Sequence, residues 1–150
     1  EIGSGLVGSE MCIRDRTKVA PELSNEAHYY RAKAYLDAGK VEGAMDDLKI
    51  LAKDTRNIYG AEAKYKVAQI YFDAGQTGQA EKEVLDYIEV STPHTYWLAR
   101  SFVLLSDVYM KLGRNLDAKQ YLLSLKQNYQ ADDDIAGMIE SRLNKLNAEN

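Results

Sequence analysis

Apolar residues in this 150-residue chain recur at intervals of three and four, the spacing that places side chains on one face of an α-helix. No segment alternates apolar and polar residues between turn signals, as a half-buried strand would. The pattern therefore predicts an all-α fold in which each apolar face is buried against a neighbour. Pairs of this kind are Leu48 and Leu51, Val84 and Ile88, and Leu122 and Leu125.

A Tyr-Xaa-Xaa-Xaa-Gly unit occurs three times, beginning at Tyr35, Tyr71 and Tyr109. Each unit has a small residue three positions before the tyrosine and an alanine five positions after the glycine. Small residues let two helices approach closely, and glycine supplies the left-handed conformation that ends a helix. A period in this range indicates stacked helical hairpins. The small residues are Ala32, Ala68 and Ser106, spaced by 36 and 38 residues, and the alanines are Ala44, Ala80 and Ala118.

Each hairpin is expected to contain a first helix, a turn at the glycine and a second helix. The starts are supported by residue types that cap helices and by a proline at a first helical position, namely Ser24, Thr77, Thr92, Asn115 and Pro93. The predicted first helices cover residues 27–38, 61–74 and 93–112, and the second helices cover 41–53, 79–89 and 116–128. The hairpins then occupy about 25–60, 61–98 and 99–131 within a domain of residues 17–131.

From residue 25 to about residue 129 the chain resembles the tetratricopeptide repeat family. The resemblance implies an α-solenoid of three hairpins. The family repeat is about 34 residues; here the connections before residues 61 and 93 are longer, and His28 and Lys64 stand where a large apolar residue is usual. We expect the extra residues to lengthen the first helices. The matching positions are Ala32, Tyr35, Ala44 and Leu48; Ala68, Tyr71, Ala80 and Val84; and Ser106, Tyr109, Ala118 and Leu122.

The longer first helices and the segment from Thr92 to Ala99 are similar to bacterial cell-envelope members of that family. These members include Tol–Pal-associated periplasmic proteins and outer-membrane-assembly lipoproteins. The similarity implies a location in the bacterial periplasm or cell envelope.

Residues 132–150 carry one apolar helical stripe, with acidic residues at the start and basic residues late in the segment, an order that suits the helix macrodipole. The segment lacks the tyrosine and glycine of the repeats, so we expect it to form a C-terminal capping helix. Its aspartates, Asp132 to Asp134, could alternatively bind a cation, but no further ligand spacing follows them. The stripe consists of Ile135, Ile139, Leu143 and Leu146.

Residues 1–16 follow none of these patterns and contain the only cysteine, Cys12. They resemble a translated sequencing-adapter or cloning scar, and such segments are excluded from fold reasoning. We therefore expect a longer repeat array of which this chain is the C-terminal piece. The Gly-Xaa-Gly-Xaa-Xaa-Gly spacing from Gly3 to Gly8 lacks the preceding strand and following helix that a dinucleotide loop needs, so no nucleotide site is predicted.

The formal net charge of -4 disfavours nucleic acid, whose binding needs a basic stripe. The longest aliphatic and aromatic run, from Phe102 to Leu105, is too short for a membrane span, so we expect no direct membrane insertion. Basic residues on the first helices are interleaved with acidic ones, which indicates a mixed, solvated surface. These residues are Lys33, Lys64, Lys66 and Arg100, with Glu26, Glu62, Asp73 and Asp107.

No catalytic constellation is recognisable. The two histidines, His28 and His94, are far apart and have no partner at metal-ligand spacing, so we expect packing or polar roles for them. No nucleophile lies in an activating context. We predict no enzyme activity, no metal, no cofactor and no small-molecule substrate.

Stacked hairpins line a concave side with their first helices, and helical spacing assigns a stripe of candidates to that side. Its flat aromatic rings and adaptable apolar residues suit a polypeptide partner. The sequence therefore predicts a protein-interaction module. Three alternatives stay open: packing of these aromatics between neighbouring helices, a purely structural end of a longer array, and a catalytic domain in an upstream segment. The candidates are Glu26, Tyr29, Lys33, Leu36, Glu62, Tyr65, Gln69, Phe72, Arg100, Val103, Asp107 and Met110.

Overall fold

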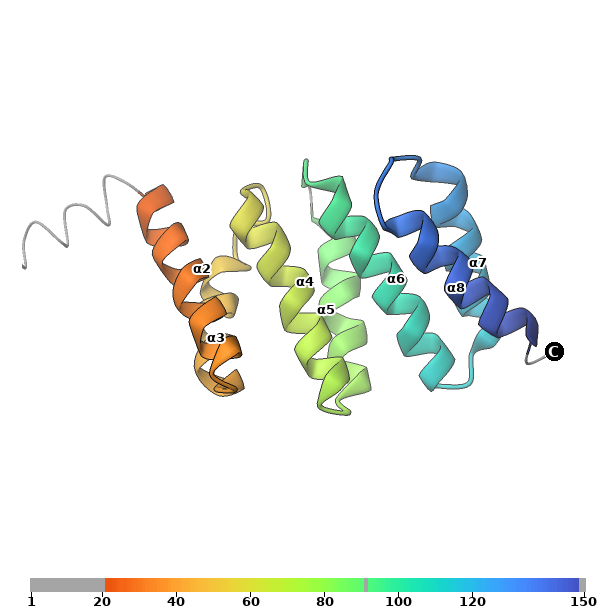
Figure 1. Cartoon of the computed structure of the whole chain (residues 1–150), viewed down its shortest axis with the longest axis horizontal. Coiled ribbons are helices and arrows are strands. Elements are labelled where there is room, and N and C mark those ends of the chain that lie inside the picture. Colours follow the sequence, from red (N-terminus) through yellow and green to blue (C-terminus); the bar gives the residue numbers. More distant parts are fainter. Residues whose placement is uncertain (1–20, 91, 149–150) are drawn as a thin grey trace, which may run out of the picture.

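The computed structural model describes residues 21–90 and 92–148, and every regular element in them is an α-helix (Figure 1). The all-α prediction is confirmed for this part of the chain. Residues 1–16, with Cys12 and the glycine-rich spacing, lie outside it. The helices are α2 (Pro21–Asp37), α3 (Val41–Leu51), α4 (Ile58–Asp73), α5 (Thr77–Glu89), α6 (Thr95–Lys111), α7 (Asn115–Asn128) and α8 (Ile135–Ala148).

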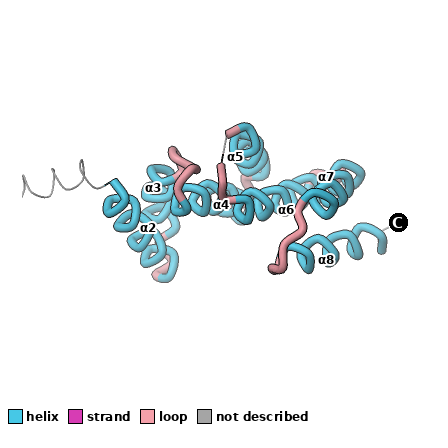
Figure 2. The backbone as a smooth tube through the Cα atoms, turned by 90° about the horizontal axis from the view of Figure 1, so that it is seen from above, coloured by secondary structure: helices cyan, strands magenta, loops and turns pink. Residues whose placement is uncertain are grey.

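Consecutive helices pack as hairpins: α2 with α3, α4 with α5, and α6 with α7. Each hairpin also packs on the next, because α4 contacts both α2 and α3, and α6 contacts both α4 and α5. The result is a row of helix pairs (Figure 1). The last helix, α8, packs on α6 and α7 and lies on the opposite side of the row from α3 and α5 (Figure 2).

The turn inside each hairpin is built in the same way. The N–H of Gly39 donates to Leu36 O at 3.0 Å, and the N–H of Lys40 donates to Tyr35 O at 2.7 Å. This pair of bonds defines the Schellman motif, which needs a left-handed residue after the helix. The same pair closes the other two turns, and the three glycines are Gly39, Gly75 and Gly113, with φ of 76°, 80° and 79°.

The small residues of the repeats are buried where the helices approach. Ala44, Ala80 and Ala118 are fully covered, and the small residues of the first helices are at most 1% exposed. The buried side chains form two clusters. One joins α2, α3 and part of α4 around Leu48, and the other extends from α4 to α8 around Leu122.

Several predicted helix starts were wrong. Helix α4 begins at Ile58 instead of residue 61, because the Asn57 side chain caps it by accepting the N–H of Gly60 at 2.7 Å. Helix α6 begins at Thr95, two residues after Pro93, and its cap position is His94.

The predicted caps Ser24, Thr77 and Asn115 lie within helices instead. Helix α2 contains Ser24, while Thr77 and Asn115 are the first residues of α5 and α7. The cap positions before them are Gln76 and Arg114, which also close the Schellman turns, so one residue ends one helix and precedes the next. Neither of these two residues makes a side-chain capping bond.

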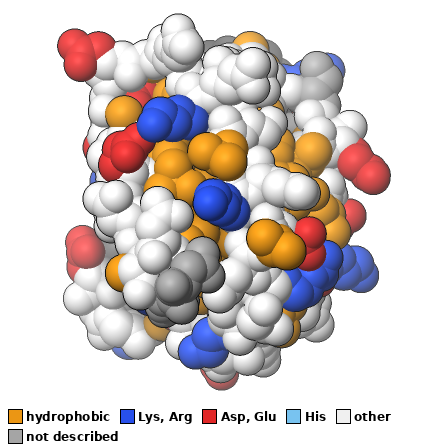
Figure 3. All heavy atoms as spheres, turned by 90° about the vertical axis from the view of Figure 1, so that its right-hand side faces the viewer, with side chains coloured by type: hydrophobic (Ala, Val, Ile, Leu, Met, Phe, Trp, Pro, Cys, Tyr) orange, Lys and Arg blue, Asp and Glu red, His pale blue; other side chains and the backbone are white. Residues whose placement is uncertain are grey.

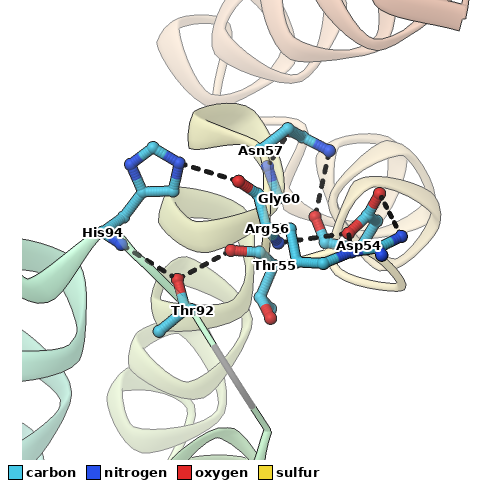
Figure 4. A network of polar contacts seen from close by, with 7 residues as sticks. All are labelled: Asp54, Thr55, Arg56, Asn57, Gly60, Thr92 and His94. Atoms are coloured by element: carbon cyan, nitrogen blue, oxygen red, sulfur yellow. Dashed lines mark hydrogen bonds and ion pairs between the residues drawn. The ribbon is translucent and has the colours of Figure 1, made fainter.

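The longer connections between hairpins are tied to each other (Figure 4). The Thr92 hydroxyl donates to Thr55 O at 2.7 Å and accepts the N–H of His94 at 3.2 Å. The His94 ring donates from Nε2 to Arg56 O at 3.0 Å, since a carbonyl oxygen only accepts. The predicted cap Thr92 therefore joins the α3–α4 and α5–α6 connections, and the bonds to Thr55 and Arg56 hold successive hairpins in register.

Candidate interaction surface

Ten of the twelve predicted groove residues reach solvent, at least in part, along α2, α4 and α6. The other two, Tyr65 and Val103, are 7% and 3% exposed and belong to the core cluster of α4 to α8. For these two the packing alternative holds, because Tyr65 of α4 lies against Trp97 and Arg100 of α6, and Val103 is on the buried face of α6. The ten exposed or partly exposed residues are Glu26, Tyr29, Lys33, Leu36, Glu62, Gln69, Phe72, Arg100, Asp107 and Met110.

At the α2 side of the row, Tyr29 is bound within the fold. Its hydroxyl donates to the Glu62 carboxylate at 3.0 and 3.1 Å, joining α2 to α4. Lys66 pairs with the same carboxylate at 2.7 Å, and Lys33 lies 5.3 Å from the Tyr29 ring centre. Burial, reinforced by Glu62, raises the pKa of Tyr29 to about 12, so the phenol stays protonated as a donor. The side chains of Tyr29, Glu62, Lys66 and Lys33 therefore interact with one another within the fold.

Arg100 makes a second occupied group between α4 and α6. Its guanidinium lies 4.9 Å from the ring centre of Tyr65 and 5.8 Å from that of Trp97, and donates to the Tyr65 hydroxyl at 3.1 Å. It also donates to the Tyr96 hydroxyl at 2.9 Å, which in turn donates to Asp134 at 2.9 Å. The guanidinium and these aromatic side chains therefore bind one another within the fold.

Two of the three aspartates before α8, Asp133 and Asp134, also have partners. Asp133 accepts the N–H of Ile135, the first residue of α8, at 2.9 Å, and it accepts the Tyr129 hydroxyl at 2.6 Å. Burial first, and then this bond, raises the pKa of Tyr129 to about 12. The four apolar residues of the predicted stripe, Ile135, Ile139, Leu143 and Leu146, are all buried.

A hollow of about 370 Å³ opens between α4, α6 and α8. It is lined by the apolar side chains of Phe72 and Met110 and by Asp107, three of the predicted groove residues. Two lysines, Lys111 and Lys145, complete the lining. The structure thus brings one predicted residue of α4 and two of α6 to one place.

The charges around this hollow are unequal. Asp107 is held by Arg142 of α8, whose Nε and Nη2 donate at 2.7 and 2.9 Å in a bidentate pair. Neither Lys111 nor Lys145 forms an ion pair or hydrogen bond with the described part of the chain. With Asp107 neutralised by Arg142, the two lysines leave a local excess of positive charge in an acidic protein.

Sequence reasoning did not find Lys111, Lys145 or Arg142 as members of this surface. Arg142 and Lys145 were recognised only as basic residues late in the last helix. Their position beside α6 depends on where α8 docks, and no motif of the tail encodes that position. The apolar stripe shows which face of α8 is buried but not which helices cover it.

A second hollow, of about 420 Å³, lies where α7 meets α8, and its lining includes Tyr129, Ala136 and Ile139. The exposed ion pair of Lys126 and Glu140, at 2.6 Å, involves two further residues of that lining. Figure 3 views this end of the row and shows hydrophobic side chains between scattered charges.

The buried polar centre of the α2–α3 hairpin was also not predicted. Asp47 is 1% exposed and accepts from Arg31 at 2.6 and 2.8 Å, and it lies 2.8 Å from His28 Nδ1. The bond from Arg31 is the main reason that the pKa of Asp47 is held below its ordinary value. His28 therefore has the polar role expected of it, in place of an apolar residue.

Residues 21–90 and 92–148 contain no group of three or more His, Cys, Asp or Glu side chains placed to hold a metal ion. None of the described helices has the length and apolar character needed to span a bilayer.

Comparison with known proteins assigns nothing further. No family model, curated protein or solved structure matches this chain.

Proposed function

We propose that this chain is a non-enzymatic protein-interaction module: a tetratricopeptide-like solenoid that binds a polypeptide on the face of its first helices. The observation that carries the proposal is the hollow lined by Phe72, Met110 and the two lysines. There the apolar side chains of Phe72 and Met110 are partly exposed, and the two lysines have no ion-pair or hydrogen-bond partner in the described chain. Elsewhere, Tyr29, Glu62 and Arg100 are engaged with neighbouring side chains.

The repeat architecture supports the family part of the proposal. Three hairpins share the same Schellman turn with the tyrosine and glycine at equivalent places. Bonds between first helices join residues about one repeat apart: Tyr29 with Glu62, and Tyr65 with Arg100. Helix α8 continues the series at the end of the row, as a capping helix would.

Selection of peptides from a random display library tests the function. We expect the selected peptides to bind the wild-type chain and to lose at least about tenfold in affinity for Phe72→Ser or Met110→Ser, because these changes remove apolar contact area. Leu123→Ser, at a 45% exposed position of α7, is the matched control and should bind as the wild type does.

Circular dichroism must show that each variant remains folded. The proposal would be contradicted if the affinity of the selected peptides fell only for Leu123→Ser, or if the library yielded no binder. The earlier candidate Tyr65 is unsuitable for this test because it is buried, and its loss would perturb the fold.

A purely structural role is the second candidate. It is favoured by the engagement of Tyr29, Arg100 and Asp107 with Glu62, Tyr65 and Arg142, which holds the first helices together and leaves fewer groups for a partner. An empty selection, together with unfolding of the variants, would favour this role.

A further inference from the structure

We propose that the hollow between α4, α6 and α8 takes an acidic–apolar peptide segment, with one large apolar side chain on Phe72 and Met110 and neighbouring side-chain carboxylates on Lys111 and Lys145. This inference rests on the proposed function and specifies the chemical class of its partner. It follows from the charge and the shape of the hollow together.

The positive charge is available because of how the fold arranges its pairs. Asp107 is the only carboxylate among the residues that line the hollow, and Arg142 donates a hydrogen bond to each of its two oxygens. Lys64 and Lys66, by contrast, are paired within the fold with Glu83 and Glu62, each at 2.7 Å. Lys111 and Lys145 have no such partner in the described chain. A ligand carboxylate could therefore pair with these two lysines without breaking an existing ion pair.

The apolar part selects against a simple anion. Phe72 and Met110 are partly buried against the α4 to α8 core, so their exposed edges are held in place by packing. Methionine adapts its shape to different side chains. The volume of about 370 Å³ lies near the lower end of the range found for ligand pockets, which suits one or two peptide side chains and not a whole helix.

The lysines must be distinguished from ordinary surface charges. Lys111 and Lys145 each lie in the last turn of their helices, where a cation also complements the helix dipole. That role requires no ligand. The proposal therefore predicts a dependence on ligand charge, which the dipole role does not.

The chain provides a reporter at the site. Of its four methionines, Met110 lines the hollow, while Met45 lies on α3 and Met138 on α8 outside the lining. In a protein labelled with ¹³C at the methionine methyl groups, NMR titration follows all of them at once. The probes are acetylated and amidated pentapeptides: Gly-Glu-Leu-Glu-Gly, its glutamine and lysine analogues, and Gly-Glu-Gly-Glu-Gly.

We expect the Glu-Leu-Glu peptide to shift the Met110 signal at low salt while the Met45 signal stays in place. The glutamine analogue should bind about fivefold to tenfold more weakly, since exposed ion pairs contribute modestly. The double variant Lys111→Gln/Lys145→Gln should lose the same factor for the acidic peptide only. Lys82→Gln/Lys119→Gln, two lysines of the second helices, is the matched control and should lose nothing.

The possible failures are distinguishable. Equal binding of the glutamate and glutamine peptides at Met110 would overturn the acidic preference and leave the proposed peptide-binding function standing. Equal response to Gly-Glu-Gly-Glu-Gly would reduce the hollow to a general anion site. No shift of Met110 with any of the four peptides, in a protein whose spectrum is that of a folded chain, would overturn this inference. A display selection without binders would overturn the function beneath it.

Discussion

At the scale of single residues, glycine serves two different purposes in this chain. Gly39 and its two equivalents are needed for a positive φ at the turns, and the Tyr-Xaa-Xaa-Xaa-Gly spacing predicts that role. Gly60 is needed for space. A Cβ at Gly60 would lie 1.8 Å from the carbonyl oxygen of Asp54, a backbone atom that cannot move aside freely.

Gly60→Ala should therefore destabilise the protein by about 3 kcal/mol, since the connection before α4 would have to shift. The matched control is Gly78→Ala, because a Cβ at Gly78 meets nothing within 4 Å. That change should leave stability the same or raise it slightly through helix propensity. Urea unfolding measures both, and equal midpoints for the two variants would contradict the close approach.

At the scale of elements, the α2–α3 hairpin is joined by a buried charge as well as by apolar packing. Asp47 lies on the buried face of α3 beside Ala44, Leu48 and Leu51. Helical spacing could place it on that face, but its partners on α2 become neighbours only when the hairpin closes. Asp47 is the buried member of this pair and Arg31 is exposed, so removal of Arg31 would cost more than the bond itself provides, because it would leave a buried carboxylate without its main partner.

Asp47→Asn should lower the free energy of unfolding by about 2 kcal/mol at neutral pH, since the charge-assisted bonds from Arg31 and His28 are weakened. The exposed neighbour provides the control, and Asp46→Asn should change little.

The pH dependence of this difference has a definite sign. The pKa of Asp47 is lowered in the folded state, so its contribution is present above the unfolded value of about 3.9 and is lost as pH falls through the folded value. Urea titrations of the wild type and Asp47→Asn should therefore differ by a constant amount above about pH 5 and converge in stronger acid. A difference that grew on acidification would contradict this account.

At the scale of the whole molecule, the row of hairpins contains two buried clusters that meet at Tyr71 of α4. In such arrays each hairpin contacts only its neighbours, so stability is approximately a sum of local and nearest-neighbour contributions. Opening at one end of the row need not open the other.

Leu48→Ala and Leu122→Ala test this at equivalent buried positions, 2% and 0% exposed. Each should cost about 3 kcal/mol. Hydrogen exchange should rise mainly in α2 and α3 for the first variant and across α6, α7 and α8 for the second. Uniform acceleration along the whole chain in both variants would show that the row unfolds as one unit.

Much of the fold was predictable because its signals are local. The tyrosine and glycine of each unit are four residues apart, and the turn they form is closed by hydrogen bonds within five residues. The stripe from Ile135 to Leu146 shows its buried face by helical spacing alone. The start of α4 was missed because Asn57 caps it, and Asn57 is itself held by a bond to Asp54 O at 3.0 Å in a connection that follows no repeat pattern.

By itself the sequence determined that the chain forms paired helices, which faces they bury and where the three glycine turns lie, because those features depend on interactions within a few residues. Only the tertiary structure decided that Tyr65 is covered, that Arg142 neutralises Asp107, and that Lys145 joins Phe72 and Met110 around one hollow. Arg142 and Asp107 are separated by 35 residues. Contacts over such distances depend on how α8 docks against α6, which is decided by the packing of whole faces and by no single motif.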